Sequence, residues 1–176
     1  MDPEMQKRMN LKIKKREGFR PFAPVVLEED IADYFELDRP SPYMLFVVPV
    51  KQKRKIPLPE DFDHLSLNER LYFNRSDIPA VTHLDYSARV QSVNKQTNPR
   101  FWSLLMEFRR QTNCSVLLNT SFNVRGEPIV CSPDDAFSCF MKTEMDILVM
   151  GNYVFDKNDQ KEFVKNNNWQ DEVNFD

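Results

Sequence analysis

Apolar residues recur in short blocks along the chain, and each block predicts one element of secondary structure. The runs 22–27 (FAPVVL), 43–48 (YMLFVV), 115–118 (SVLL) and 146–150 (DILVM) all have strand length. A continuous apolar run is typical of a strand that is buried on both faces. We therefore expect buried core strands at these positions, the last of them stopped at Gly151.

Two helices are marked by residues that cap their N-termini. Asn98 precedes Pro99, and Ser132 precedes Pro133 with two aspartates behind it. A capping side chain followed by proline at the first helical position is a helix start signal. In the first helix the apolar side chains recur at i, i+3, i+4 and i+7, which predicts one packed face. These side chains are Phe101, Leu104, Leu105 and Phe108.

Weaker signals fill the remaining chain. Residues 28–35 predict a short helix, and residues 81–85 and 88–93 predict two short strands joined by a polar turn. A brief pairing is expected at 129–131, and residues 50–78 show no long period and predict a connector. Strands that alternate with helices predict an α/β fold, and the short strand–turn–strand makes the sheet mixed rather than purely parallel.

Composition narrows the class of protein. The chain has 176 residues, 41% of them hydrophobic and 14 of them Phe, which suits one folded domain and argues against disorder. The longest apolar run, residues 44–50, is far shorter than the roughly 20 residues of a membrane helix. The first ten residues lack the apolar stretch that a signal peptide requires. We therefore expect a cytoplasmic protein with no membrane segment.

The few glycines, cysteines and histidines exclude several common sites. Three glycines far apart cannot form a dinucleotide fingerprint or a Walker A loop. Three cysteines without a CxxC pair and two histidines argue against a zinc site, so no metal ligands are assigned. The odd number of cysteines suits a reducing compartment. Cys131 and Cys139 are expected in the core, since free cysteine is among the most buried residue types.

The first candidate site is a basic segment near the N-terminus. Residues 7–20 hold seven basic groups and one acid, although the chain has a net charge of −3. Lys14, Arg16 and Arg20 could converge if the backbone breaks near Gly18. One interpretation is a solvated basic face. The other is a clamp in which ammonium and guanidinium groups grip phosphate oxygens.

The second candidate site is the polar loop that follows the predicted strand 115–118. It carries Asn119, Thr120, Ser121, Asn123 and Arg125. Ligands in open α/β sheets bind beyond the carboxyl ends of strands. The alternative is a turn whose polar side chains cap their own backbone.

The third candidate site lies around the strand 88–93. Ser87, Arg89 and Gln91 share one face of a strand by its period of two. Asp85 could orient His83 or pair with Arg89. A single histidine is more often structural than functional, so both interpretations of His83 stay open.

Five segments that follow one another between about residues 10 and 153 carry a family resemblance. They are IKKREGFRPFAPVVLEE, IPAVTHLDYSARVQSV, NPRFWSLLMEF, VLLNTSFNVRGEPIVCSPDDAFSCF and DILVMGNY. In this respect the chain resembles the C-terminal domain of the NodU-type O-carbamoyltransferases, which has a YrdC-like fold, an open twisted mixed sheet with helices packed on it. Lys15 departs from the family pattern, which usually has an apolar residue there.

The resemblance implies a function and a site. Carbamoyl phosphate and ATP, with Mg²⁺ bridging the ATP phosphates, would give carbamoyl-adenylate and pyrophosphate. A separate ATPase-like N-terminal domain with a metal centre would pass the carbamoyl group to a hydroxyl acceptor. The implied contacts to phosphate or carbamoyl groups are Lys14, Arg20, Arg89 and Arg125. The implied anion-site elements KxR and SxN add Arg16, Ser121 and Asn123 as binding residues, and we add His83 from the third cluster.

The expected organisation follows from the same resemblance. Residues 1–10 would be an arm or linker, residues 11–155 the YrdC-like domain and residues 156–176 a polar tail. Because the acceptor pocket belongs to the other domain, this chain alone is not expected to complete the transfer. Two alternatives stay open: a threonylcarbamoyl-adenylate synthase-like domain, and a non-catalytic module for protein or nucleic acid. The mildly acidic chain makes nucleic acid the less favoured partner.

Overall fold

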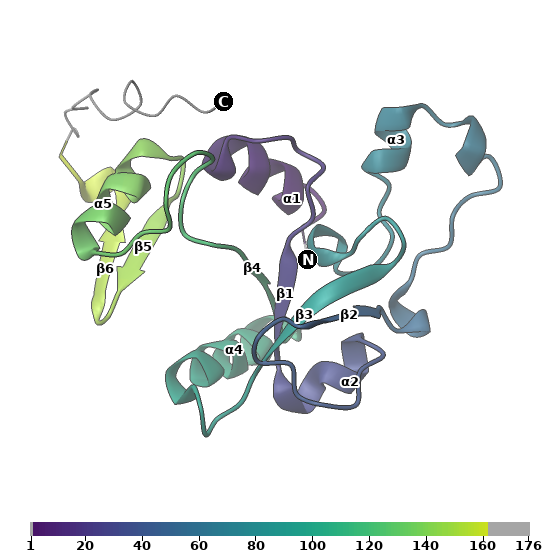
Figure 1. Ribbon diagram of the computed structural model, residues 1–176, viewed down its shortest axis with the longest axis horizontal. Coiled ribbons are helices and arrows are strands. Elements are labelled where there is room, and N and C mark those ends of the chain that lie inside the picture. The colour runs from purple at the N-terminus through teal and green to yellow at the C-terminus, as the bar shows by residue number, and fades with distance from the viewer. Residues whose placement is uncertain (1, 162–176) are drawn as a thin grey trace. The chain divides into compact units, whose positions relative to one another are not determined.

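The computed structural model describes residues 2–161 and divides the chain into two compact units. The first comprises residues 1–121 and the second begins at Phe122. Figure 1 shows the elements of both units along the chain. The predicted domain boundaries at residues 10 and 155 stay a prediction, and most of the predicted polar tail lies outside the described residues.

A four-stranded mixed sheet organises the first unit. Its strands are β1 (Ala23–Leu27), β2 (Phe46–Pro49), β3 (Ser87–Val93) and β4 (Val116–Asn119), in the order β2-β3-β1-β4. β1 runs parallel to β3, and the other two pairs are antiparallel. The predicted α/β class with an open mixed sheet is therefore confirmed.

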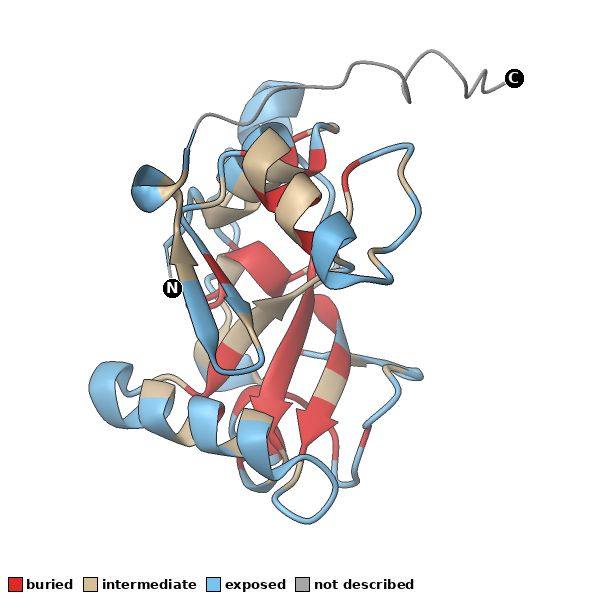
Figure 2. Ribbon diagram, turned by 90° about the vertical axis from the view of Figure 1, so that its left-hand side faces the viewer, coloured by how far each residue is buried: buried red, intermediate tan, exposed pale blue. Residues whose placement is uncertain are grey.

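The central strand β1 is buried along its whole length, as its apolar run predicted. Val26 packs on one face with Phe35, Val90 and other residues of the main core. Val25 and Leu27 pack on the opposite face, because side chains alternate along a strand. Figure 2 shows how burial concentrates in this sheet.

The helix α4 (Pro99–Thr112) covers the Val25 face. Asn98 caps it as predicted, and its side chain accepts a hydrogen bond from the Phe101 backbone N–H at 3.3 Å. Leu105 is fully buried, but Leu104 is 57% exposed, so the predicted apolar face was partly wrong. Trp102 and Met106 pack beside Leu105 instead, which rotates the buried stripe around the helix.

Short helices connect these strands. Their bounds are α1 (Met5–Arg8), a π-helical segment at Met9–Lys14, α2 (Ile31–Tyr34), α3 (Leu67–Leu71), and 3₁₀ turns at Glu28–Asp30, Gln52–Arg54, Phe62–His64 and Pro79–Val81. The connector between β2 and β3 thus holds α3 and three 3₁₀ turns rather than any strand longer than an isolated bridge.

Two strand predictions in this unit were wrong. Val81 ends the turn Pro79–Val81, and residues 83–86 form a second turn, so β3 has no hairpin partner there. Its antiparallel neighbour is β2, which is an edge strand with Val47 58% exposed. An edge strand tolerates Pro49, which cannot donate to the ladder. The apolar run 43–48 therefore reflected an exposed surface rather than burial on two faces.

The second unit contains a helix and a small sheet. α5 (Pro133–Lys142) begins with the predicted cap, because Ser132 and Asp135 form a reciprocal capping box. β5 (Ile147–Met150) pairs with β6 (Tyr153–Asp156), and a 3₁₀ turn follows at Lys157–Asp159. β6 was not predicted: its first three residues were assigned no element, and Asp156 was placed in the polar tail.

Three further expectations in this unit were wrong. Residues 129–131 form no strand, and Cys131 is exposed, whereas Cys139 is buried as expected. β5 is not a core strand, because Leu148 is its one buried residue. One face of this small sheet packs on α5, where Phe155 of β6 meets Phe137.

Candidate functional site

One end of the four-stranded sheet gathers several of the predicted site residues. The register pairs Ala23 of β1 with Asn119 of β4, and Ser87 of β3 with Pro49 of β2. The starts of β1 and β3 and the end of β4 therefore lie at the same end of the sheet. The segments that precede β1 and β3 and the one that follows β4 meet there, and these segments carry the first-unit candidates.

Lys14 and Ser121 contact each other directly. The Lys14 ammonium donates to the Ser121 backbone oxygen at 2.8 Å and contacts its hydroxyl oxygen at 3.2 Å. Lys14 is 4% exposed, so this charge is buried at the end of the first helical segment. The solvated-face interpretation is therefore wrong for Lys14. Burying an ammonium group destabilises the fold unless hydrogen bonds or an anion compensate for its lost hydration.

Asn10 holds the loop that carries the other basic side chains. It is fully buried, and its amide donates to the carbonyl oxygens of Gly18 at 3.1 Å and Arg20 at 2.8 Å. Its side-chain oxygen accepts from Arg16 Nε at 2.7 Å. This role of Asn10 was not predicted from the sequence. A lone asparagine within a basic segment gave no periodic signal, and its role depends on the loop closing back on it.

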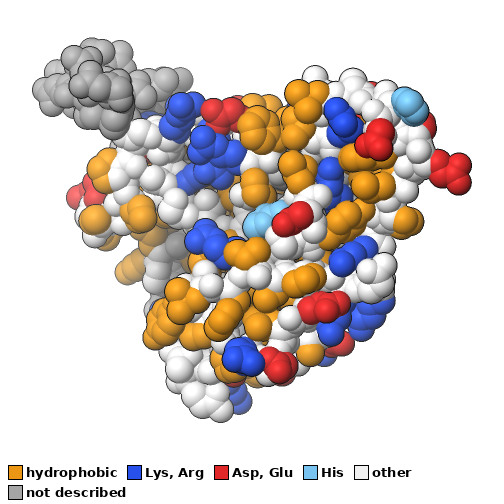
Figure 3. Space-filling model, turned by 45° about the vertical axis from the view of Figure 1, so that its right-hand side comes forward, with side chains coloured by type: hydrophobic (Ala, Val, Ile, Leu, Met, Phe, Trp, Pro, Cys, Tyr) orange, Lys and Arg blue, Asp and Glu red, His pale blue; other side chains and the backbone are white. Residues whose placement is uncertain are grey.

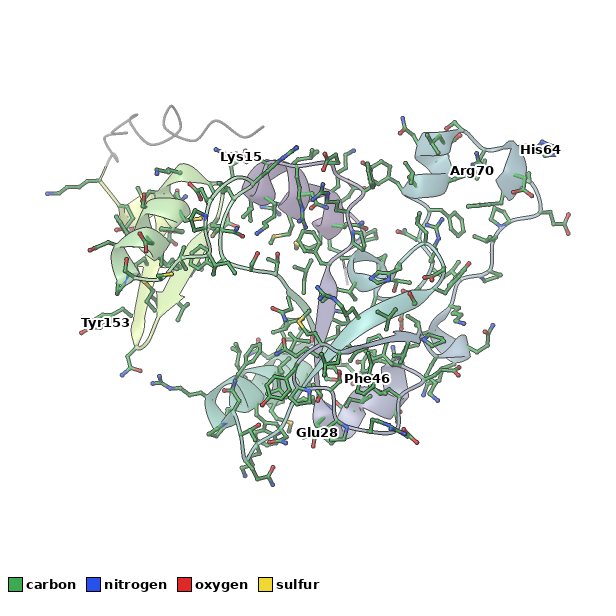
Figure 4. The ribbon with its side chains drawn as sticks, in the orientation of Figure 1. Lys15, Glu28, Phe46, His64, Arg70 and Tyr153 are labelled. Carbon is green, nitrogen blue, oxygen red and sulfur yellow. The ribbon has the colours of Figure 1, made fainter. Side chains whose placement is uncertain are left out.

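The backbone leaves the helix at Lys15, not at Gly18 as predicted. Lys15 has φ +51°, in the left-handed region, and its side chain is exposed at the end of the helical segment (Figure 4). The reversal is stabilised by Asn10, whose carbonyl accepts the Arg16 N–H at 3.0 Å. Because Lys15 is exposed, its charge sacrifices no packing.

Arg16 and Arg20 are held differently from Lys14. The Arg16 guanidinium lies 5.0 Å from the centre of the Phe22 ring, and burial, followed by the charge of Arg20, lowers the Arg16 pKa below its ordinary value. Arg20 is half-exposed and pairs with Glu17 at 3.0 Å. Arg16 is thus built into the loop, while Arg20 lies at its surface, where an anion can compete with Glu17.

The face of β3 that carries Arg89 is polar at this end of the sheet. Ser87, Arg89 and Gln91 alternate along the strand, as predicted, and Arg89 is exposed. The Asn119 amide donates to the Gln91 side-chain oxygen, so polar groups of β3 and β4 meet across β1. Figure 3 shows that, on the face drawn there, basic side chains stand among acidic and hydrophobic ones rather than in one continuous belt.

His83 is linked to Asp85 through Ser87. Ser87 donates to Asp85 Oδ1 from its backbone at 3.0 Å and from its hydroxyl at 2.6 Å. His83 Nδ1 lies 3.0 Å from the Ser87 hydroxyl oxygen. Burial lowers the pKa of His83, the Asp85 charge opposes this effect and Arg89 adds to it. Asp85 therefore orients His83 indirectly.

The candidates in the second unit belong to a loop that closes on itself. The Asn123 amide donates to the Glu127 backbone oxygen at 2.7 Å, and Gly126 has φ +81° in the turn. The Val130 N–H donates to the Phe122 oxygen at 3.0 Å. Asn123 thus fits the predicted self-capping turn, while Arg125 is exposed on it.

Residues 2–161 contain neither a metal-binding cluster nor a membrane-spanning helix. No three His, Cys, Asp or Glu side chains gather there closely enough to hold a metal ion. Across the same residues, no helix has both the length and the apolar character needed to cross a bilayer.

The fold and the site define a mixed α/β domain with basic and hydroxyl side chains at one end of its main sheet. Residues 1–157 match the family described as Carbamoyltransferase C-terminus, and the chain belongs to this family. The resemblance drawn from the sequence is thereby confirmed.

Curated relatives agree with this assignment. The chain is 55% identical over 172 residues to an uncharacterized protein of Synechocystis, covering 98% of this chain and 28% of that protein. It is 42% identical to the nodulation protein NolNO of Sinorhizobium fredii, covering 85% of this chain and 20% of that one. It is 36% identical to nodulation protein U of Rhizobium tropici, with coverages of 78% and 20%. The chain therefore spans between about a fifth and somewhat over a quarter of the length of these relatives.

Proposed function

We propose that this domain binds carbamoyl phosphate and ATP and forms carbamoyl-adenylate. The observation that carries the proposal is the buried Lys14 ammonium bound to Ser121. This contact unites the two elements, KxR and SxN, that the family resemblance assigns to an anion site, and family membership makes the carbamoyl group the transferred one. The threonylcarbamoyl alternative shares the KxR and SxN elements, which belong to the wider YrdC-like group, but family membership does not favour it.

The reaction needs cations at the positions where phosphate oxygens lie. Water releases carbamate and phosphate from carbamoyl phosphate, and a carbamate oxygen then attacks the α-phosphorus of ATP as pyrophosphate leaves. Lys14, Arg20 and Arg89 would hold the transferred oxygens and stabilise the charge that develops on them. For Arg125 we propose the same role from the family resemblance alone. Arg16, Ser121 and Asn123 would shape the loops that present these groups.

Mg²⁺ would neutralise ATP phosphates, which is the chemistry it commonly supplies in phosphoryl transfer. We assign it no protein ligand and no step. The hydroxyl acceptor and its ATPase-like domain would belong to the remaining length of the full protein. This chemistry suits the cytoplasm, where ATP is available and the thiols of Cys114, Cys131 and Cys139 stay reduced.

Pyrophosphate release tests the proposal. The chain is mixed with carbamoyl phosphate, ATP and Mg²⁺, and release should depend on carbamoyl phosphate. Arg20→Ala and Arg125→Ala should each lower the rate on the order of 10²-fold, since each would donate to transferred oxygens. Arg39→Ala is the matched control, because Arg39 is exposed and paired with Asp38.

Binding provides an independent measurement. Carbamoyl phosphate or AMP at millimolar concentration should raise the melting temperature, because a ligand that binds only the folded state stabilises it. Unchanged melting with both ligands, together with no pyrophosphate release, would refute the proposed function. Unchanged rates in Arg20→Ala and Arg125→Ala would remove these two residues from it.

A further inference from the structure

The chain of Asp85, Ser87 and His83 constrains where the imidazole carries its proton. Hydrogen bonds from Ser87 lower the pKa of Asp85, so its carboxylate is ionised at neutral pH and can only accept. A serine hydroxyl has one proton, and here it points to Asp85 Oδ1 at 2.6 Å. The Ser87 oxygen can then only accept from His83 Nδ1. Neutral His83 is therefore the Nδ1–H tautomer, and its Nε2 carries a lone pair.

His83 lies beside the proposed anion site. It lines a cavity of about 100 Å³ together with Phe19 and Pro21, which flank Arg20 in the loop before β1. Arg89 lies on β3 two residues beyond Ser87, and its charge contributes to the lowered pKa of His83. Lys7 and Arg75 line the cavity as well, whereas the side chains of the proposed anion site do not, so the neutral acceptor stands next to that site and near other cations.

A neutral acceptor and a set of cations recognise different ends of a substrate. Cations attract phosphate and carbonyl oxygens, whereas a lone pair repels those oxygens and attracts an N–H. Carbamoyl phosphate carries one amide group, and acetyl phosphate has a methyl group in its place. An acceptor at Nε2 would distinguish these two molecules, because binding the methyl group leaves this half-buried acceptor unpaired.

We propose that His83 selects the carbamoyl group by accepting a hydrogen bond from its amide N–H at Nε2. This inference rests on the proposed function. Ser87 and Asp85 are positioning residues, since they act on the substrate only by fixing the tautomer of His83. The backbone contact between the His83 N–H and the Ser87 oxygen at 2.8 Å holds the two residues in register.

Calorimetric titration of the 176-residue chain with carbamoyl phosphate and with acetyl phosphate tests the selection. His83→Asn removes the acceptor at the Nε2 position and should reduce the preference for carbamoyl phosphate about tenfold, the value of one hydrogen bond. His83→Gln extends an amide oxygen toward that position and should retain part of the preference. His64→Gln is the matched control, because His64 is exposed on an outer turn (Figure 4).

The outcomes separate this inference from the proposed function. If wild-type protein binds carbamoyl phosphate and His83→Asn keeps the full preference, the role of His83 is refuted while the proposed function stands. If wild-type protein binds no carbamoyl phosphate, the proposed function itself fails and the selection fails with it.

Nitrogen-15 spectra of histidine-labelled protein test the tautomer directly. With two histidines in the chain, the His64→Gln variant assigns the remaining signals to His83. The wild type should show a protonated Nδ1 and an unprotonated Nε2 above the titration range, and Ser87→Ala should mix the tautomers. A protonated Nε2 in the wild type would overturn the inference whatever the binding result.

Discussion

The basic segment of residues 10–20 and the polar loop of residues 122–130 carry similar side chains but are held in different ways. In the basic segment, buried Asn10 fixes the backbone around Arg16 and Arg20, and Lys14 is buried against Ser121. In the polar loop, Asn123 closes a short turn at the surface. The first arrangement is part of the core of its unit, whereas the second is local. Residues of the same type should therefore be more sensitive to substitution in the basic segment than in the polar loop.

The largest difference should appear in stability. Asn10→Ala leaves two carbonyl oxygens and the Arg16 Nε without their partner, and should lower the free energy of unfolding by about 3 kcal/mol. Asn123→Ala removes a half-buried side chain from a local turn and should cost about 1 kcal/mol. Urea unfolding of both variants measures the two values. Equal losses would show that the polar loop is as deeply built in as the basic segment.

The charge of Lys14 should matter more for binding than for folding. Lys14→Met fills a similar volume without a buried charge, but it leaves the Ser121 carbonyl oxygen without this donor, so it should cost about 1 kcal/mol of stability. Carbamoyl phosphate affinity should fall about thirtyfold, since hydrogen bonds to charged groups are the stronger ones. Titration calorimetry and urea unfolding of the same variant separate these effects.

Lys15→Met is the control for Lys14→Met, because Lys15 is adjacent in sequence but exposed. It should leave affinity within about twofold, as expected for an exposed charge. If the Lys14→Met variant bound carbamoyl phosphate with wild-type affinity, the Lys14 ammonium would contribute to the fold and not to binding.

A smaller effect should appear in the pH dependence of stability, because His83 of the third cluster titrates. Burial lowers the folded-state pKa of His83, so the unfolded chain takes up the proton first as pH falls. Stability should therefore decrease below about pH 6.5, the ordinary histidine value, and level off at the lower folded-state pKa. His83→Gln should lack this decrease. Urea unfolding of both proteins between pH 8 and pH 5 gives the difference, and an increase in wild-type stability on acidification would contradict it.

Sequence patterns predicted well the elements that are set by local chemistry. The caps Asn98 and Ser132 and the buried strand β1 were found because a cap or a continuous apolar run is a local signal. The edge position of β2 and the strand β6 were not found. Whether an apolar run lies at an edge depends on which strands flank it, and the run itself is the same in either place.

The site was predicted in parts for the same reason. The resemblance placed Lys14 and Ser121 in one site from two motifs far apart in the chain, and the structure brings them into direct contact. Asn10 was missed, and the link from Asp85 to His83 through Ser87 was not foreseen, because both depend on how a turn closes. Hydrogen bonds within a turn require the turn to be known first.

The central strand β1 leaves the ribosome long before either of its neighbours. β3 and β4 follow only after the whole connector and, for β4, also α4 have been made. Pairings between distant segments form slowly, and an apolar strand that waits for its partners can associate with other chains. Synthesis speed through residues 28–115 should therefore influence how much of the protein reaches its native state.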